Sequence, residues 1–156
     1  MRTNIPFSIW RKYAARGSAS HSSAISPTRG SGCITTAASF NRSLWAATAA
    51  AISREARAFM NAGHGYSTYW DVVINLAREP RWGRNLETAG EDPFMSGQYA
   101  VEFVRGMQEA PEDDAHLMAS ACCKHYVANQ MEHSTVAGVT HDRLAFDALV
   151  SQEDLL

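Results

Sequence analysis

The chain has 156 residues, of which 46% are hydrophobic and 19% charged, and its formal net charge is −2. This length suits one ordinary globular domain and is short for two domains of typical size. Four Trp and six Phe argue against wholesale disorder, and ten Gly with five Pro exclude collagen-like or low-complexity chains. No apolar run reaches the roughly 18 residues that a membrane-spanning helix needs. We therefore expect one domain or a part of one, with an apolar core and no membrane contact.

Basic residues are distributed unevenly along the chain. Half of them precede Glu55, which is the first acidic residue. Beyond Glu55 the acidic groups dominate, which argues against a nucleic-acid surface because phosphate binding needs clustered positive charge. Residues 1–32 are basic, Ser-rich and free of acidic residues, and we expect a disordered tail that precedes a domain at 33–156. An organellar targeting segment is the alternative, since the tail lacks the continuous apolar segment of a secretory signal.

The first predicted helix lies in the segment NRSLWAATAAAISREARAFMNAG, which Asn41 can cap and Gly63 can end. Five apolar residues recur at helical spacing and are expected to form its buried face: Leu44, Ala51, Ile52, Ala56 and Phe59. A Gly-rich turn then leads to residues 69–76, YWDVVINL, whose β-branched and aromatic residues predict a buried strand.

A second helix is predicted after a polar loop. Asp92 can cap this helix and Pro93 can occupy its first turn, and Val101, Val104 and Met107 are expected to form its apolar side. Residues 117–123, LMASACC, are apolar and small, which suits an interior strand. The remainder predicts a polar loop followed by a helix that begins near Asp142 or Phe146.

The alternation of helices with short buried strands favours an α/β fold with a parallel sheet. Two polar clusters, at 81–91 and 124–132, each follow a predicted strand directly. Functional loops of parallel sheets lie beyond the carboxyl ends of the strands, so the two clusters are expected to open on the same edge and to meet at one ligand.

The residue types in these clusters suit a polyhydroxylated ligand. Arg81, Trp82 and Arg84 combine guanidinium groups with an indole, which can bind hydroxyls and stack on the apolar face of a sugar. Lys124 and His125 are adjacent donors at a strand end. Structural ion pairing is the alternative for the arginines, with three acidic residues of the same loop as partners: Glu87, Glu91 and Asp92.

Several motifs in the same order resemble a known family. They are ITTAASFNRSLW, YWDVVINLAREPRWGRNLETAGEDP, ACCKHYVANQMEH and FDALVSQEDL, and they closely resemble the N-terminal barrel domain of glycoside hydrolase family 3, β-xylosidase-like members in particular. The resemblance covers about residues 34–156. It implies an exo-acting retaining glycosidase, built on a (β/α)8 barrel, that releases a terminal β-linked sugar in carbohydrate breakdown.

The resemblance also implies roles for single residues. The sugar-binding arginine of the family falls on Arg84 and its Lys-His pair on Lys124 and His125, all three contacting hydroxyls of the sugar at the cleavage subsite. Glu132 lies where xylosidase-like members place a carboxylate, with a solvated loop glutamate as the alternative. Two further matching features are expected to be structural: the helix-capping pair Glu91 and Asp92, and a packed Trp82.

The family's nucleophile and acid/base carboxyl have no counterpart among the matched residues, so no catalytic residue is assigned. A full barrel takes roughly 250 residues, so the matched part corresponds to roughly half of one, with parallel strands alternating with helices. We expect the missing barrel half to be needed for a complete fold, and we expect residues 33–156 expressed alone to be prone to aggregation and to lack glycosidase activity. The xylosidase type is commonly secreted, which implies an extracellular location although no clear signal peptide is present.

Other classes of function compete with this interpretation. A non-catalytic carbohydrate-binding protein or a remnant would keep the sugar-facing loops without the acids. Four histidines are spaced by eight or nine residues, which matches no compact metal-ligand motif: His116, His125, His133 and His141. Neither G-x-G-x-x-G nor a Walker sequence occurs, which argues against nucleotide binding. Three Cys, two of them adjacent, indicate no disulfide framework. We expect no metal or cofactor, and a small oligosaccharide or β-glycoside as the partner.

Overall fold

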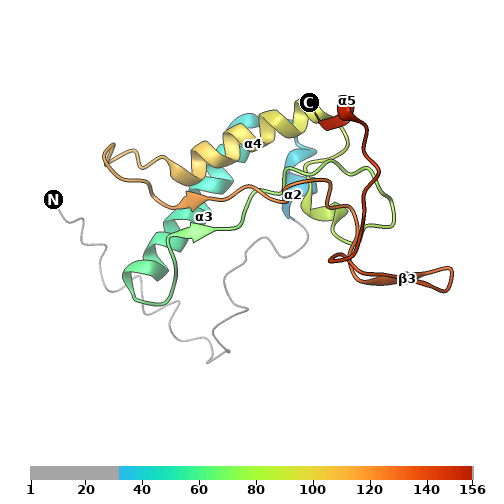
Figure 1. Cartoon of the computed structure of the whole chain (residues 1–156). Helices are drawn as coiled ribbons and strands as arrows, with labels where there is room; N and C mark the ends of the chain where they lie inside the picture. Colours follow the sequence, from blue (N-terminus) through green and yellow to red (C-terminus); the bar gives the residue numbers. More distant parts are fainter. Residues whose placement is uncertain (1–31, 156) are drawn as a thin grey trace.

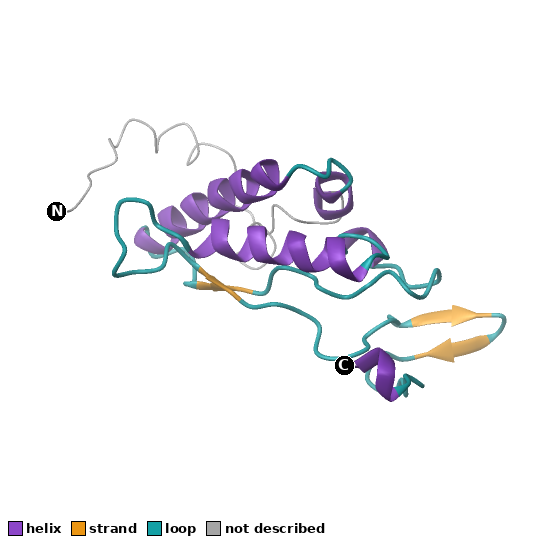
Figure 2. Ribbon diagram, turned by 90° about the horizontal axis from the view of Figure 1, so that it is seen from above, coloured by secondary structure: helices purple, strands orange, loops and turns teal. Residues whose placement is uncertain are grey.

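The computed structural model describes residues 32–155, so the predicted tail at 1–32 lies almost entirely outside the described residues. Two long helices, α3 and α4, pack side by side, and two parallel strands, β1 and β2, lie against them (Figures 1 and 2). The elements are, in order, α2 (Gly32–Ala37), α3 (Arg42–Asn61), β1 (Thr68–Tyr69), η1 (Asn85–Glu87), α4 (Pro93–Gln108), β2 (Ser120–Ala121), β3 (Ser134–Val136), β4 (Val139–His141) and α5 (Gln152–Leu155).

Helix α3 begins and ends where the sequence predicts. The Asn41 side chain accepts a hydrogen bond from the backbone N–H of Leu44 at 3.1 Å, which satisfies one of the free donors of the first turn. After the last turn Gly63 has a φ of 78°, a left-handed conformation that glycine adopts without a steric penalty. Both end signals are therefore confirmed.

The predicted buried face of α3 is mostly wrong. The residues that the helix buries are Trp45, Ala49, Ser53 and Ala56, and of the predicted set only Ala56 is among them. Leu44 is 44% exposed and Phe59 is 37% exposed. The Trp45 indole packs edge-on against the ring of Tyr99 at 5.3 Å and donates to the carbonyl of Thr36 at 2.8 Å. The large indole thus sets the rotation of the helix, and small residues complete the contact face.

Helix α4 is capped as predicted, but its apolar side is turned. Asp92 accepts from the N–H of Met95 at 2.5 Å, and Pro93 occupies the first turn. The buried residues are Ser96, Tyr99, Phe103 and Met107, so Met107 is confirmed, whereas Val101 is 47% exposed and Val104 is partly buried. The two aromatic rings, which the sequence pattern did not weigh, face α3. Between the helices, Gly106 lies against the backbone of Ala46, which allows a close crossing.

The two predicted strands run side by side and parallel, as expected. Regular pairing is shorter than predicted and joins β1 to β2, with Thr68 opposite Ser120 and Tyr69 opposite Ala121. An isolated parallel bridge then pairs Val73 with Lys124, where the N–H of Lys124 donates to the Val72 carbonyl at 3.0 Å. This bridge brings the polar residues that follow the two strands to the same edge. The part of the expected barrel beyond this α/β arrangement stays a prediction.

The predicted C-terminal helix near Asp142 or Phe146 is wrong. Residues 142–150 form no regular element, and α5 is the element that follows them in the described part of the chain. Ahead of this segment lies a β3–β4 hairpin that the sequence analysis interpreted as a loop. Its turn residues, Ala137 and Gly138, have φ values of 50° and 79°, which is the backbone pattern of the type I′ turns that match strand twist. The hairpin projects away from the two long helices (Figure 2).

No helix within residues 32–155 is long and apolar enough to span a membrane. The cysteines at positions 33, 122 and 123 are free thiols.

We expect the change Asn41→Ala to lower the free energy of unfolding by about 1 kcal/mol, because it removes the acceptor for the Leu44 N–H. Urea denaturation measures the change. The control is Ser43→Ala, at an exposed side chain in the same helical turn, which should change the unfolding free energy by less than about 0.5 kcal/mol. Equal losses in the two variants would contradict the capping role.

Candidate functional site

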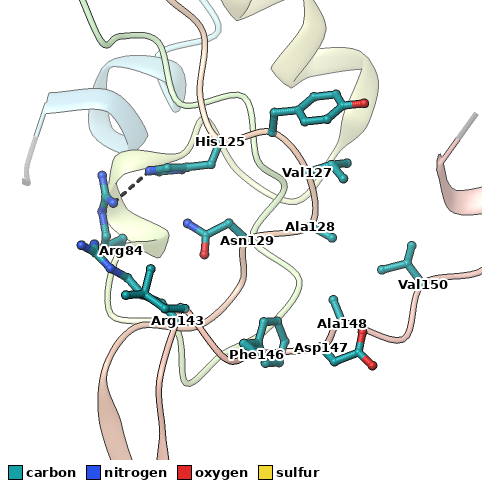
Figure 3. A pocket seen from close by; sticks show the side chains of 12 residues that line it. Arg84, His125, Val127, Ala128, Asn129, Arg143, Phe146, Asp147, Ala148 and Val150 are labelled. Carbon is teal, nitrogen blue, oxygen red and sulfur yellow. Dashed lines mark hydrogen bonds between the residues drawn. The ribbon is translucent and has the colours of Figure 1, made fainter.

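The two polar clusters meet, as the strand geometry predicts. Arg84 lies just before η1 in the loop after the first strand segment, and His125 follows the bridge residue Lys124. The guanidinium Nη1 of Arg84 lies 2.9 Å from Nε2 of His125 (Figure 3). Residues 41 positions apart are thus in hydrogen-bond contact at the carboxyl ends of two parallel strand segments.

Arg84 is the centre of the cluster. It binds Glu87 through two hydrogen bonds, from Nε to Oε1 at 2.9 Å and from Nη2 to Oε2 at 2.6 Å. Its Nη1 also lies 3.5 Å from Oε1 of Glu132. The hydrogen bond to Glu87 is the main cause that raises the pKa of Arg84, so the guanidinium is permanently charged. One edge of the planar guanidinium, Nε and Nη2, is thereby fixed by Glu87, and Nη1 lies near His125 and Glu132.

Lys124 shares Glu87 with Arg84. Its Nζ lies 3.8 Å from Oε2 of Glu87, and both side chains are mostly buried. The hydrogen bonds from Arg84 lower the pKa of Glu87, with the charge of Lys124 adding to this effect and partial burial opposing it. Glu87 is therefore an ionised anchor that holds two cations in place. The alternative interpretation of Arg84 as an ion-pair partner of Glu87 is confirmed as a contact, and it coexists with the contact to His125.

His125 is held in its neutral form. Burial lowers the pKa of its imidazole, and the positive charges of Arg84 and Lys124 lower it further, while Glu87 and Glu132 act in the opposite direction. The unfolded chain protonates this histidine at pH values where the folded chain keeps it neutral. Stability from this residue is therefore lost as the pH falls below the ordinary value of 6.5.

Glu132 is bound by donors from three sides and is not a freely solvated loop residue. Its Oε1 lies 3.4 Å from Nε1 of the buried Trp82 indole and 3.5 Å from Nη1 of Arg84. Its Oε2 lies 3.3 Å from Nη1 of Arg143. Trp82 is 2% exposed and packs as predicted. Arg81, by contrast, is exposed and pairs with Glu79 at 2.6 Å, so the expectation that it faces a ligand is not supported by its contacts.

Sequence reasoning missed Arg143 because it assigned this residue to a helix start. The β3–β4 register pairs Ser134 with His141, and continuing that register by two residues places Glu132 opposite Arg143. The Ala-Gly turn flanked by valines was the signal that could have predicted this contact. Both residues are therefore brought together by the base of the hairpin.

Of the residues described above, Arg84, His125 and Arg143 border a pocket of about 600 Å³ (Figure 3). Its polar wall includes Arg84, His125, Asn129 and Arg143, and its apolar wall includes Val127 and Phe146. Hydrogen-bond donors on one wall and apolar carbons on the other match the two kinds of surface on a sugar ring. Among the described residues, no group of three or more His, Cys, Asp or Glu side chains is placed to hold a metal ion.

Comparisons with known proteins identify the family of the chain. The glycosyl hydrolase family 3 N terminal domain model matches residues 18–149. The chain is 49% identical over 123 residues to β-xylosidase/α-L-arabinofuranosidase 1 of Medicago sativa subsp. varia. The aligned residues cover 78% of this chain and 15% of that protein. It is 48% identical over 122 residues to β-D-xylosidase 1 of Arabidopsis thaliana, with coverage of 78% and 15%.

Solved structures give the same result. One is a family 3 exo-β-xylosidase in complex with a xylobiose aziridine probe, with a TM-score of 0.59, 35% identity and coverage of 64% of this chain and 13% of that chain. Another is a mutant β-glucosidase from Listeria innocua in complex with laminaribiose, with a TM-score of 0.61, 26% identity and coverage of 80% and 16%. The chain spans about 15% of the length of its first curated relatives. Because the family model matches 132 residues of the chain and a curated relative is 49% identical to it, the chain belongs to glycoside hydrolase family 3.

Proposed function

We propose that this chain supplies the sugar-binding side of an exo-acting, retaining β-glycosidase of the β-xylosidase type. The observation that carries the proposal is the meeting of Arg84 and His125 from two strand ends at one pocket, with Lys124 beside them through its contact with Glu87. The relatives are β-xylosidases by name, and one similar structure holds a xylobiose-derived probe. The strands and helices would form about half of a (β/α)8 barrel that other residues complete.

The cluster contains both hydrogen-bond donors and hydrogen-bond acceptors for a sugar. Arg84 and Lys124 offer N–H groups, and Glu132 offers carboxylate oxygens that can accept from hydroxyls. Neighbouring hydroxyls on a sugar ring each donate and accept, so a donor beside an acceptor can bind both at once. Glu87 has a supporting role, because its two oxygens are bound by Arg84 and approached by Lys124.

The same contacts separate binding from bond cleavage. A retaining glycosidase needs two carboxyl groups about 5 Å apart, one as nucleophile and one as acid/base. Two carboxylates contact arginines that line the pocket: Glu87 is bound by Arg84, and Glu132 is bound by Arg143 and approached by Arg84. A carboxylate held by cations is a poor proton donor. We therefore assign both to binding and expect the two reacting carboxyl groups to come from residues outside this chain.

Calorimetric titration of the soluble fraction of the purified chain with xylose and xylobiose tests the proposal. We expect binding with a dissociation constant on the order of 1 mM, which corresponds to about −4 kcal/mol. Xylitol, a polyol without a ring, is the control and should bind more weakly. No heat with either sugar, from a chain that unfolds cooperatively, would overturn the proposal.

A non-catalytic carbohydrate-binding protein is the second candidate, favoured by the ion pairs that occupy Glu87 and Glu132. Assay of an aryl β-xyloside distinguishes the two. The 156-residue chain should give no turnover above a host-extract control in either case. A longer chain that adds the remaining barrel should hydrolyse the xyloside only if the glycosidase proposal is right.

A further inference from the structure

A buried amide, Asn75, contacts the histidine of the site from behind. Asn75 is 7% exposed, and its Oδ1 accepts from the backbone N–H of His125 at 2.7 Å. The same oxygen lies 3.1 Å from Nδ1 of the His125 ring. The amide Nδ2 donates to the carbonyl of Asn129 at 2.9 Å, so all parts of this side chain are engaged. Asn75 thus links the first strand segment to both ends of the loop that contains His125.

These contacts determine which ring nitrogen bears the proton. A guanidinium has no acceptor, so His125 Nε2, which lies 2.9 Å from Arg84 Nη1, must accept. The neutral ring then has its proton on Nδ1, directed at Oδ1 of Asn75. The orientation of the amide is fixed as well, because a backbone N–H meets one of its ends and a carbonyl oxygen meets the other.

We propose that Asn75 is a positioning residue that holds His125 as the Nδ1–H tautomer, so that Nε2 meets the pocket as a hydrogen-bond acceptor. The sequence analysis expected His125 to be a donor, and the contacts with Arg84 and Asn75 reverse that role. A sugar hydroxyl that enters between the two groups would donate to Nε2 in place of the Arg84 N–H and would itself accept from Arg84. The part of the inference that concerns sugar rests on the proposed function, whereas the tautomer does not.

Charges from each neighbouring segment affect this arrangement. Arg84 and Glu87 face the ring from the first loop, Lys124 is its neighbour in the chain, and Glu132 faces it from the second loop. Burial and the two cations outweigh the two carboxylates, so the pKa of His125 lies below its usual value. In acid the ring gains a proton on Nε2, which then opposes the N–H of Arg84. We therefore expect sugar binding to weaken as the pH falls through the pKa of His125.

Long-range ¹H–¹⁵N spectra of the histidine side chains in the purified chain test the tautomer directly, with His125→Gln assigning the signals. We expect Nδ1–H in the wild-type chain. Asn75→Leu removes one of the two contacts that favour Nδ1–H, at nearly constant volume, and leaves only the contact with Arg84, so it should produce a mixture with the Nε2–H form. Xylobiose affinity should then fall about tenfold, equivalent to about 1.4 kcal/mol. The Nε2–H tautomer in the wild-type chain, or an unchanged spectrum in Asn75→Leu, would overturn the proposal.

Two more variants separate positioning from general loss of structure. Gln130 is also 7% exposed and donates to the Leu76 carbonyl at 3.0 Å, so Gln130→Leu removes a buried amide at the same strand end and should keep Nδ1–H. Asn75→Asp keeps the acceptor and adds a negative charge, which should retain Nδ1–H and raise the pKa of His125 by about 1 unit or more. An unchanged pKa there would overturn the proposal even if Asn75→Leu does not fold.

The failure of the proposed function would look different. If the tautomer responds to Asn75 but no sugar binds, the positioning role stands and the sugar-binding function fails. If sugar binds and the tautomer is the same with and without Asn75, the sugar-binding function stands and the positioning role fails.

Discussion

Arg84→Ala is expected to weaken xylobiose binding by about 10- to 100-fold, below calorimetric detection for a ligand of millimolar affinity. The change removes the donor that contacts His125 and Glu132 together and leaves Glu87 with Lys124 as its remaining cation. Hydrogen bonds to charged groups contribute about 1.5–3 kcal/mol each, which sets the size of the loss. Calorimetry with xylobiose checks the loss: the wild-type chain should give a heat of binding and Arg84→Ala should give none.

Arg81→Ala is the matched control for this experiment. Arg81 lies in the same R-W-G-R segment, but it is exposed and pairs with Glu79, so xylobiose affinity should be unchanged. In Arg84→Ala the pKa of His125 should rise, since the charge of Arg84 is the second cause, after burial, of its low value. A variant that loses stability while keeping its sugar affinity would show that Arg84 has a structural role only.

Gly106→Ala is expected to lower the free energy of unfolding by about 1–3 kcal/mol, the typical cost of overpacking. An alanine Cβ at this position would lie 3.0 Å from the carbonyl carbon of Ala46 and nearer still to its oxygen. Both neighbours are backbone atoms of α3, which cannot rotate away. The helices would have to separate, and the packing of Tyr99 and Phe103 between them would loosen. Urea denaturation measures the loss.

The same substitution elsewhere in α4 should have the opposite sign. A Cβ at Gly97 has no atom within 4 Å, so Gly97→Ala gains helix propensity without a clash and should stabilise the chain by about 0.5–1 kcal/mol. If both alanine variants stabilise the chain, the close crossing at Gly106 is not a constraint on the fold.

Local signals and strand direction were sufficient to predict several features. Asn41 and Asp92 cap helices because their side chains can reach N–H groups within the same turn, which needs no tertiary information. The meeting of Arg84 with His125 followed from the parallel arrangement of two strands. The resemblance identified the same residues independently.

Features that depend on partners far along the chain were not predictable in this way. Which face of α3 is buried depends on the rings that α4 presents, so Trp45 and not Leu44 faces inward. Arg143 reaches Glu132 through a hairpin whose turn contains an alanine with positive φ, which is uncommon for that residue. Asn75 was part of a strand pattern, and only its contacts with His125 distinguish it from the apolar residues around it.

The hairpin that joins Glu132 to Arg143 also determines how this region can vary in length. Because β3 and β4 pair one to one, trimming one residue from each arm would shorten the projection and leave the acidic and basic partners opposite each other. Trimming a single arm would shift the alternation of side chains and turn Arg143 to the other face. Insertions or deletions that change both arms by the same number of residues are therefore compatible with an intact pocket. A one-residue change in a single arm is not.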